Sequence, residues 1–307
     1  MALLQAADTV DRAERAWTAS ELHKILNGPH TRATSDCFVA EAYGGAPAGF
    51  AALEPWVGTP GAQKVVVHGV VHPDWRRCGI GAGLMLAAEA RAAEIMSTLP
   101  GGAGLPQHLD AFCRSFQNDA AALFESRGMK PVRYFFGMQR DLRAALPDAV
   151  APEGIVIRTY RAENSAPALS AFNDAFGDHW EFQVITPELW QHDFVGVPYF
   201  RPDLWFLAWD GDEIVGFTFN LVDLPYTERV GRREGIVDKV GVRRPWRKRG
   251  LGAALLAHSL RALREAGMDF AFLGVDADSL TGAVRLYERA GFRELRRTVV
   301  YRKVLTR

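Results

Sequence analysis

The chain has 307 residues, 48% hydrophobic and 23% charged, so it can bury one large core or two cores of ordinary size. Lys and Arg together number 36, as do Asp and Glu, and the formal net charge is zero. This balance excludes the strong positive field of a non-specific nucleic-acid binder, and we expect no nucleic-acid partner.

The three cysteines, Cys37, Cys78 and Cys113, stand far apart and are odd in number. They suggest neither a disulfide framework nor zinc-binding spacing, and we expect no metal. The opening residues turn polar at once and contain no signal-peptide core, and no apolar run is long enough to span a bilayer. We therefore predict a cytoplasmic protein without a membrane partner.

In chain order, the first half has a short opening strand and a Gly- and Pro-rich insertion at residues 100–106, after its long helix. The segment PDAVAPEG, which ends at Gly154, carries two prolines and predicts a linker over residues 148–154. One domain is therefore expected at residues 1–147 and a second at residues 155–307.

The second half alternates between strand and helix patterns. The expected strands are residues 155–160, 205–209, 213–221, 235–242, 270–275 and 298–305. The expected helices are residues 165–176, 186–194, 250–266 and 282–289. The first half follows the same order, so we predict an α/β fold class: two tandem mixed sheets, each flanked by helices.

The two halves share two landmarks in the same order. Residues 71–81 match residues 242–252 at Val, Trp, Arg, Gly and Gly, with equal spacing. Residues 123–129 match residues 286–292. The two landmarks indicate duplication of a whole domain, because a solenoid would need more copies at a shorter period.

The most informative segment is R-x-x-G-x-G at residues 247–252, which follows a predicted strand and opens a helix. Glycine lets the backbone turn tightly, and the first N–H groups of a helix form an anion site suited to a pyrophosphate. The spacing fits neither a Rossmann fingerprint nor a Walker A loop. The motif recurs at residues 76–81, and two copies in one setting favour ligand binding over a ligand-free turn.

The strand, the R-x-x-G-x-G helix start and the L-Y-E-R-x-G-F box at residues 286–292 resemble the GNAT acetyltransferase superfamily, twice and over nearly the whole chain. Residues 178–180, 238–247 and 275–278 are similar to tandem GNAT proteins of the actinobacterial type, a group that includes mycothiol synthase. The resemblance implies two GNAT folds arranged as a pseudo-dimer within a monomer. It also implies acetyl transfer from acetyl-CoA to an amine, and leaves the acceptor open.

The resemblance also implies which residues contact acetyl-CoA. In the second half these are Val240, Val242, Arg247, Lys248, Arg249, Gly250, Leu251, Gly252, Ala253 and Ser279. In the first half they are Arg76, Gly79 and Gly81. Ser279 stands where related tandem proteins often carry Asn, which departs from the family pattern.

Acyl transfer from a thioester needs an acid for the leaving thiolate and donors for the oxyanion. Backbone N–H groups of the strand at residues 235–242 can supply the donors. The resemblance makes Tyr287, in the L-Y-E-R-x-G-F box, the acid. The alternative is a half-buried helix tyrosine that makes one hydrogen bond.

Asp238 is the first candidate for the base that deprotonates the amine, because an unpaired carboxylate among apolar strand residues is costly. Strand alternation places Glu234, Ile236 and Asp238 on one face. The resemblance implies an acidic residue on the cleft face of this strand. Pairing of Asp238 with a nearby Arg is the alternative, and Glu234 could serve as base directly or through water.

Asp178, His179 and Trp180 lie between the first two helices of the second half, where the resemblance implies a loop that covers the acceptor. They are the expected substrate-binding residues. The alternative is a Trp anchored in the core, with solvated charges beside it.

The repeat allows an internal comparison. Opposite Tyr287 the first half has Phe124, and at equal spacing it has Val67 opposite Asp238. Neither can carry a proton. We therefore expect catalysis in the second half alone, with a small-molecule amine as acceptor; the alternative is an acyl-CoA-binding or sensing protein without catalysis.

Overall fold

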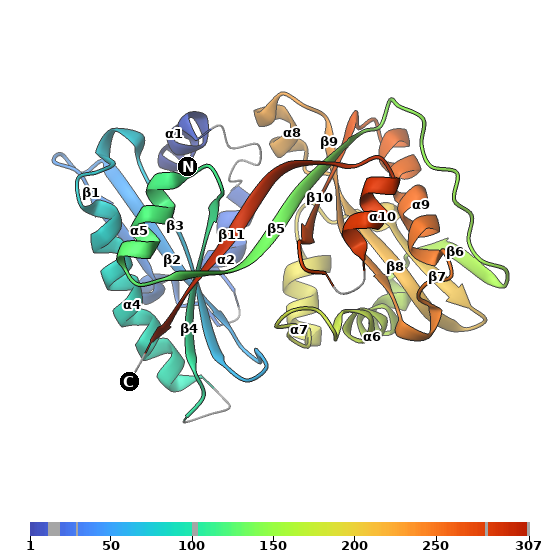
Figure 1. Ribbon diagram of the computed structural model, residues 1–307, viewed down its shortest axis with the longest axis horizontal. Coiled ribbons are helices and arrows are strands. Elements are labelled where there is room, and N and C mark those ends of the chain that lie inside the picture. The colour runs from blue at the N-terminus through green and yellow to red at the C-terminus, as the bar shows by residue number, and fades with distance from the viewer. Residues whose placement is uncertain (12–18, 29, 100–103, 280–281, 306–307) are drawn as a thin grey trace. The chain divides into compact units, whose positions relative to one another are not determined.

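A computed structural model of the chain describes residues 1–11, 19–28, 30–99, 104–279 and 282–305 (Figure 1). The chain forms two compact units. Unit 1 consists of Met1–Tyr134 with Thr298–Arg307, and unit 2 of Phe135–Arg297.

Unit 1 is a mixed sheet with helices. Its helices are α1 (Ala2–Val10), α2 (Ala19–Leu26), α3 (Ala33–Asp36), α4 (Ile80–Thr98) and α5 (Asn118–Ser126), with the 3-10 turn η1 (Pro73–Trp75). Its strands are β1 (Cys37–Glu41), β2 (Pro47–Trp56), β3 (Gln63–Val71), β4 (Gln107–Arg114), the start of β5 (Lys130–Asp141) and the end of β11 (Arg293–Leu305). Pairing is antiparallel from β1 to β3, parallel between β3 and β4, and antiparallel between β4 and β11.

Unit 2 repeats this plan. Its helices are α6 (Ser165–Phe176), α7 (Pro187–Trp190), α8 (Leu224–Val230), α9 (Leu251–Glu265) and α10 (Ala283–Arg289), with the short turns η2 (Ala162–Asn164), η3 (Gln191–Val195), η4 (Pro202–Leu204) and η5 (Arg244–Trp246). Its own strands are β6 (Ile155–Thr159), β7 (Trp205–Asp210), β8 (Glu213–Leu221), β9 (Glu234–Val242) and β10 (Phe270–Asp276). Pairing is antiparallel from β6 to β9 and parallel between β9 and β10.

The sheet of unit 2 buries apolar side chains on both faces. On one face, Val237, Leu273 and Val275 pack with α9 and α10. On the other, aromatic residues of β7 and β8 such as Phe217 pack with α6 and α7. In unit 1 the corresponding core lies under α4 and α5 and contains Val67.

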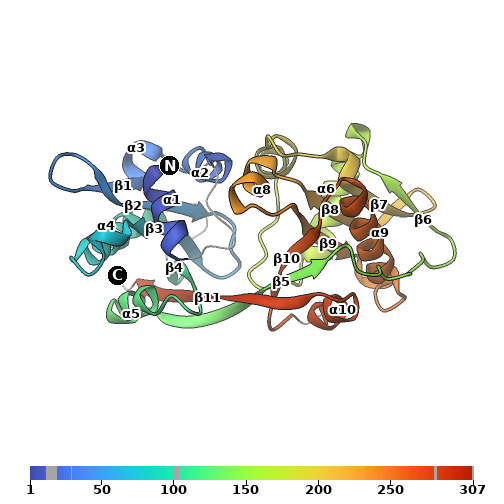
Figure 2. The same cartoon turned by 90° about the horizontal axis from the view of Figure 1, so that it is seen from above.

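Two strands each pass from one unit into the other (Figure 2). From Phe135 onward, β5 pairs with β10 of unit 2, and from Thr298 onward, β11 pairs with β4 of unit 1. Each unit is thus completed by a strand that comes from the other half of the sequence. The sequence does not predict this exchange.

A buried ion cluster holds the exchanged end of β11 in unit 1. The Asp110 carboxylate is fully buried and accepts two hydrogen bonds of 2.7 Å from the Arg302 guanidinium. The Lys64 ammonium lies 3.3 Å from the same carboxylate. Because an unpaired buried charge is costly, this cluster favours one register for the closing strand.

The predicted fold class is confirmed in both units. Three details differ from the expected elements: residues 186–194 form α7 followed by the π-helical turn η3, α8 was not expected, and β11 begins at Arg293 rather than at residue 298. Residues 148–154 contain neither helix nor strand. Residues 100–103 of the predicted insertion lie outside the described residues.

Candidate functional site

The R-x-x-G-x-G loops of the two units have the same backbone conformation. Gly250 caps α9 with a φ of +86°, and Gly79 caps α4 with a φ of +82°. Lys248 and Arg77 occupy matching positions with φ of +60° and +63°, which is uncommon for residues with a side chain. The same turn therefore precedes α4 and α9. An anion site of the predicted kind uses the first N–H groups of such a helix.

The first arginine of each loop binds protein groups. The Arg247 guanidinium donates to the Asp178 carboxylate at 2.5 Å, to the Ala175 carbonyl at 2.8 Å and to the Val242 carbonyl at 2.9 Å. The hydrogen bond from Arg247 keeps the pKa of Asp178 below its usual value. The predicted cofactor residue Arg247 and the predicted substrate residue Asp178 thus brace the loop against the end of α6.

The same brace exists in unit 1. The Arg76 guanidinium donates to both carboxylate oxygens of Asp11, at 2.6 and 2.9 Å, and to the Val71 carbonyl at 3.3 Å. Its guanidinium is therefore engaged by protein groups, as is that of its counterpart in unit 2.

The remaining loop residues divide into exposed and packed positions. Lys248 and Arg249 are exposed beside Gly250, where they can meet phosphate groups. Leu251 is buried under the sheet. Gly252 lies against Leu286, and Ala253 is half-buried. In unit 1, Gly81 packs in the same way against Leu123.

The central strands of unit 2, β9 and β10, pair at their first residues and separate beyond them. Glu234–Ile236 of β9 pair with Phe270–Phe272 of β10. Beyond these, no further pairs join the two strands within the described residues, although they continue to Val242 and Asp276. Val240 lies on the separated part of β9, where it is half-buried against α9.

A β-bulge lies at the start of this separation. Phe219 of β8 pairs with Lys239, and the next residue, Asn220, pairs with Val237. Asp238 is the extra residue. Bulges re-aim side chains and are frequent beside active sites. Here the carboxylate of Asp238 and the ammonium of Lys239, which would point to opposite faces in a regular strand, lie 2.9 Å apart.

The bulge corrects one detail of the internal comparison. In unit 1, β3 pairs with β2 without interruption, and Val67 pairs with Leu53. When paired positions are counted back from the phosphate loops, Val67 corresponds to Val237. Asp238 has no counterpart, because it is the bulge residue. Equal spacing in the sequence matched Val67 to Asp238 because it cannot reveal an inserted bulge residue.

The two acidic candidates for the base differ in exposure. Asp238 is about one-third exposed and ion-paired with Lys239. Glu234 is buried, accepts a hydrogen bond of 2.5 Å from the Gln139 amide and lies 3.1 Å from the Arg232 guanidinium. Glu234 is therefore held in place by its neighbours, whereas Asp238 reaches solvent.

Tyr287 is buried in the core under α9 and α10, with its ring 6.0 Å from Phe292. Burial raises its pKa to about 12, so the phenol stays protonated. Its counterpart Phe124 is also buried, with its ring 5.5 Å from that of Tyr301.

Both halves of the chain are similar to known proteins. A model described as Acetyltransferase (GNAT) family matches residues 169–292, and an Acetyltransferase (GNAT) domain model matches residues 33–130. A mycothiol acetyltransferase of Geodermatophilus obscurus is 32% identical over 298 residues, which cover 95% of this chain and 89% of that protein.

Two solved structures are also similar. A GCN5-related N-acetyltransferase from Sphaerobacter thermophilus has a TM-score of 0.78 and 29% identity, covering 99% of this chain and 90% of that one. A tandem GNAT protein from the clavulanic acid biosynthesis pathway shares the fold at 16% identity, with a TM-score of 0.67 over 98% of this chain and 93% of that one.

The chain belongs to the tandem GNAT acetyltransferases. It is accordingly an N-acetyltransferase that uses acetyl-CoA. The phosphate loop of this acetyltransferase fits the cofactor, because Gly250 caps α9 in a conformation that exposes the first helical N–H groups, next to exposed basic side chains.

The expected acceptor loop of this acetyltransferase follows α6. The His179 ring stacks on Phe176 with 4.3 Å between centroids. The residue is exposed, and desolvation of its ring lowers the pKa of His179. The Trp180 ring lies 6.4 Å from that of Phe135, which the exchanged strand β5 supplies. The loop therefore meets a residue from the first half of the sequence.

Ser279 is half-buried, just after β10, and its N–H donates to the Asp276 carbonyl at 3.1 Å. Residues 280 and 281, which follow it, lie outside the described residues. The turn is further held by the N–H of Asp278, which donates to the Asp276 carboxylate at 3.1 Å.

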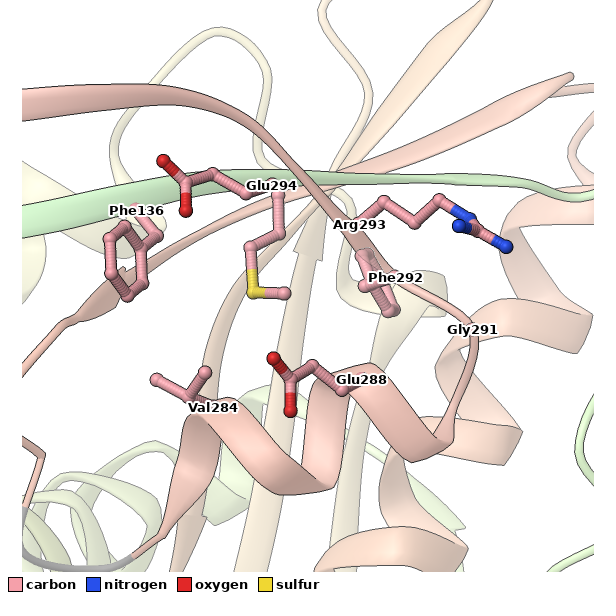
Figure 3. Close-up of a pocket in the computed structure, with 8 residues that line it drawn as sticks. Phe136, Val284, Glu288, Gly291, Phe292, Arg293 and Glu294 are labelled. Carbon is pink, nitrogen blue, oxygen red and sulfur yellow. The ribbon is translucent and has the colours of Figure 1, made fainter.

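A hollow of about 440 Å³ lies beside α10 (Figure 3). Its lining includes Phe136, Met138, Val284, Glu288 and Glu294. Met138 belongs to the core under α9 and α10, whereas Lys239, paired with Asp238, approaches the Phe194 ring on the other face. We therefore do not assign the acceptor to this hollow.

Among the described residues, no helix is long and apolar enough to cross a bilayer, and no group of His, Cys, Asp and Glu could hold a metal ion.

Proposed function

We propose that unit 2 transfers the acetyl group of acetyl-CoA directly to a primary amine, and that the N-terminal domain, residues 1–147, is not catalytic. The observation that carries this proposal is the bulge at Asp238. It occurs where β9 and β10 separate, and unit 1 has neither the extra residue nor an acid at the position of Tyr287.

Asp238 is the proposed base. Its carboxylate is partly exposed on the separated part of β9, so an amine or a bridging water can reach it. The Lys239 ammonium donates to this carboxylate at 2.9 Å and orients it. Glu234, buried between Gln139 and Arg232, is better suited to fixing the strand.

Tyr287 is the proposed acid. Acetyl-CoA, when bound, supplies the thioester that undergoes attack. Because the Tyr287 phenol stays protonated, it can donate its proton to the leaving sulfur across the neutral pH range. Backbone N–H groups of β9 are the proposed oxyanion donors.

The proposed acceptor is a small-molecule primary amine. Relatives that carry the name mycothiol acetyltransferase support this class, and a mycothiol-type acceptor is one member of it. The free thiols Cys37, Cys78 and Cys113 support a reducing, cytoplasmic setting. We propose that the chain acts as a monomer. We also propose that it does not bind nucleic acid, since its net charge is zero.

The test is release of free thiol from acetyl-CoA across a panel of primary amines that includes glucosamine, ethanolamine and a lysine-containing peptide. Amine-dependent release by the wild type is expected. Tight binding of acetyl-CoA without release for any amine would instead support the binding or sensing alternative.

A further inference from the structure

Two glycines face each other across neighbouring strands of unit 2. Gly274 of β10 pairs with Gly137 of β5. Gly274 is exposed, its φ lies outside the left-handed region, and a Cβ built there would meet no atom within 4 Å. Neither the backbone nor packing therefore requires glycine at residue 274. A glycine inside a strand often marks a place where a ligand approaches closely.

Gly274 lies on the face of the sheet that carries the proposed acceptor groups. Leu273 and Val275 are buried under α9 and α10, so alternation directs Gly274 and Asp276 to the opposite face. On that face Lys239, the partner of Asp238, approaches the ring of Phe194.

The surroundings of Gly274 carry charged and aromatic side chains. Asp276 lies two residues further along the same face and pairs across the strands with Phe135, which contacts Trp180. Beyond Ile236 and Phe272, where β9 leaves β10, the Asp238 bulge begins. The Asp276 carboxylate thus lies on the face of Gly274, and the Arg296 side chain packs on the same face against Gly137.

Unit 1 fills the equivalent position. When Val67 is matched with Val237, the parallel pairs of β3 with β4 and of β9 with β10 make Phe112 the counterpart of Gly274. Phe112 is 36% exposed, so its ring stands on the sheet surface.

The partner position is filled as well. Phe112 pairs with Val300 of β11, as Gly274 pairs with Gly137 of β5. In unit 2 the Arg296 side chain and the Phe272 ring fill the space at Gly137, so only Gly274 is open. Unit 1, which also lacks the bulge, has an aromatic side chain at the position of Gly274.

We propose that Gly274 is a specificity-determining residue for the acceptor. The space that its missing side chain leaves receives a compact primary amine on the face that carries Asp276. This inference rests on the proposed function of unit 2, and it adds the size of the acceptor.

The test introduces the unit 1 residue into unit 2. Gly274→Phe is expected to lower kcat/KM for the best amine of the panel by about 100-fold, and Gly274→Ala by about tenfold, mainly through KM, since small changes in pocket size have effects of this order. The dissociation constant of acetyl-CoA, measured by calorimetry, is expected to stay within about twofold. The control is Phe112→Gly, for which unchanged turnover is expected.

The outcomes separate this inference from the function on which it rests. If the wild type turns over no amine, the proposed function fails. If the wild type is active and both Gly274 variants keep its KM for the amine, the inference is wrong. Circular dichroism checks the fold of each variant, and Gly274→Ala decides alone if the larger substitution unfolds the protein. Equal losses in Phe112→Gly and Gly274→Phe would also contradict it.

Discussion

In both units, the strand before the phosphate loop is antiparallel to one neighbour and parallel to the other, and a glycine with positive φ caps the following helix. Each loop is braced by an arginine bound to an aspartate. The units differ further along the same strand. Unit 2 has the bulge at Asp238, the phenol of Tyr287 and the open position at Gly274, where unit 1 has a regular strand, Phe124 and Phe112.

This comparison indicates that the loop geometry suited to a pyrophosphate can be kept without the features proposed for catalysis. The loop depends on backbone geometry, which both units retain. The proposed chemistry depends on the inserted residue Asp238, the phenol of Tyr287 and the missing side chain at Gly274. Variants that exchange these features between the units should therefore break the difference in a predictable order.

Deletion of Asp238 should have the largest effect. It removes the proposed base and restores the regular register that β3 has in unit 1. Turnover is expected to fall by about 10⁴-fold, because base and oxyanion donors are lost together. Thiol-release kinetics measure the loss, and a folded deletion variant with more than a tenth of wild-type activity would contradict the role of the bulge.

Asp238→Asn keeps the bulge and removes only the base. Turnover at neutral pH is expected to fall by about 10³-fold. The defect should shrink as pH rises, because more of the acceptor amine is then already neutral. A pH–rate profile parallel to that of the wild type would move the base role to Glu234 or to water, and Glu234→Gln would distinguish these.

Tyr287→Phe gives unit 2 the residue that unit 1 has at this position. A fall in kcat of about 100-fold is expected, with little change in the affinity for acetyl-CoA, because the phenol acts on the leaving sulfur. Since burial raises the pKa of Tyr287 to about 12, ionisation of this phenol should not change the wild-type rate between about pH 6 and about pH 9. Unchanged kcat at saturating acetyl-CoA would exclude the acid role.

The sequence predicted the loops and most strands and helices of unit 2, because glycine spacing and hydrophobic alternation are local properties. It could not predict the bulge, because a bulge residue looks like any other strand residue in the sequence. The bulge shows only in the pairing of β9 with β8. It also could not predict that Arg247 binds Asp178, which is 69 positions away, or that Phe135 and Gly137 come from the first half of the chain. These depend on tertiary contacts.

Asp178→Ala should have a smaller effect. It removes the carboxylate that holds Arg247, and a fall in Tm of about 3 °C is expected, corresponding to about 1 kcal/mol. The pKa of Asp178 is lowered in the folded protein, so this stabilisation is present above the unfolded pKa and is lost as pH falls through the folded value. Wild type and variant should converge in acid.

The matched control is Asp11→Ala, which removes the brace of Arg76 in unit 1. It should lower Tm by a similar amount and leave the affinity of unit 2 for acetyl-CoA unchanged. If Asp178→Ala differed from wild type equally at all pH values, the ion pair would not be the source of its stability effect.

The claim that one unit catalyses is tested most directly by placing tryptophan in each phosphate loop. Gly250 and Gly79 have nearly the same φ, and a Cβ at either would meet no atom within 4 Å, so the structural cost of the two substitutions is matched. Gly250→Trp is expected to abolish amine-dependent thiol release by blocking close approach of a pyrophosphate, while Gly79→Trp retains most of it. Equal loss of turnover in two variants with native circular dichroism would contradict a single active site in unit 2.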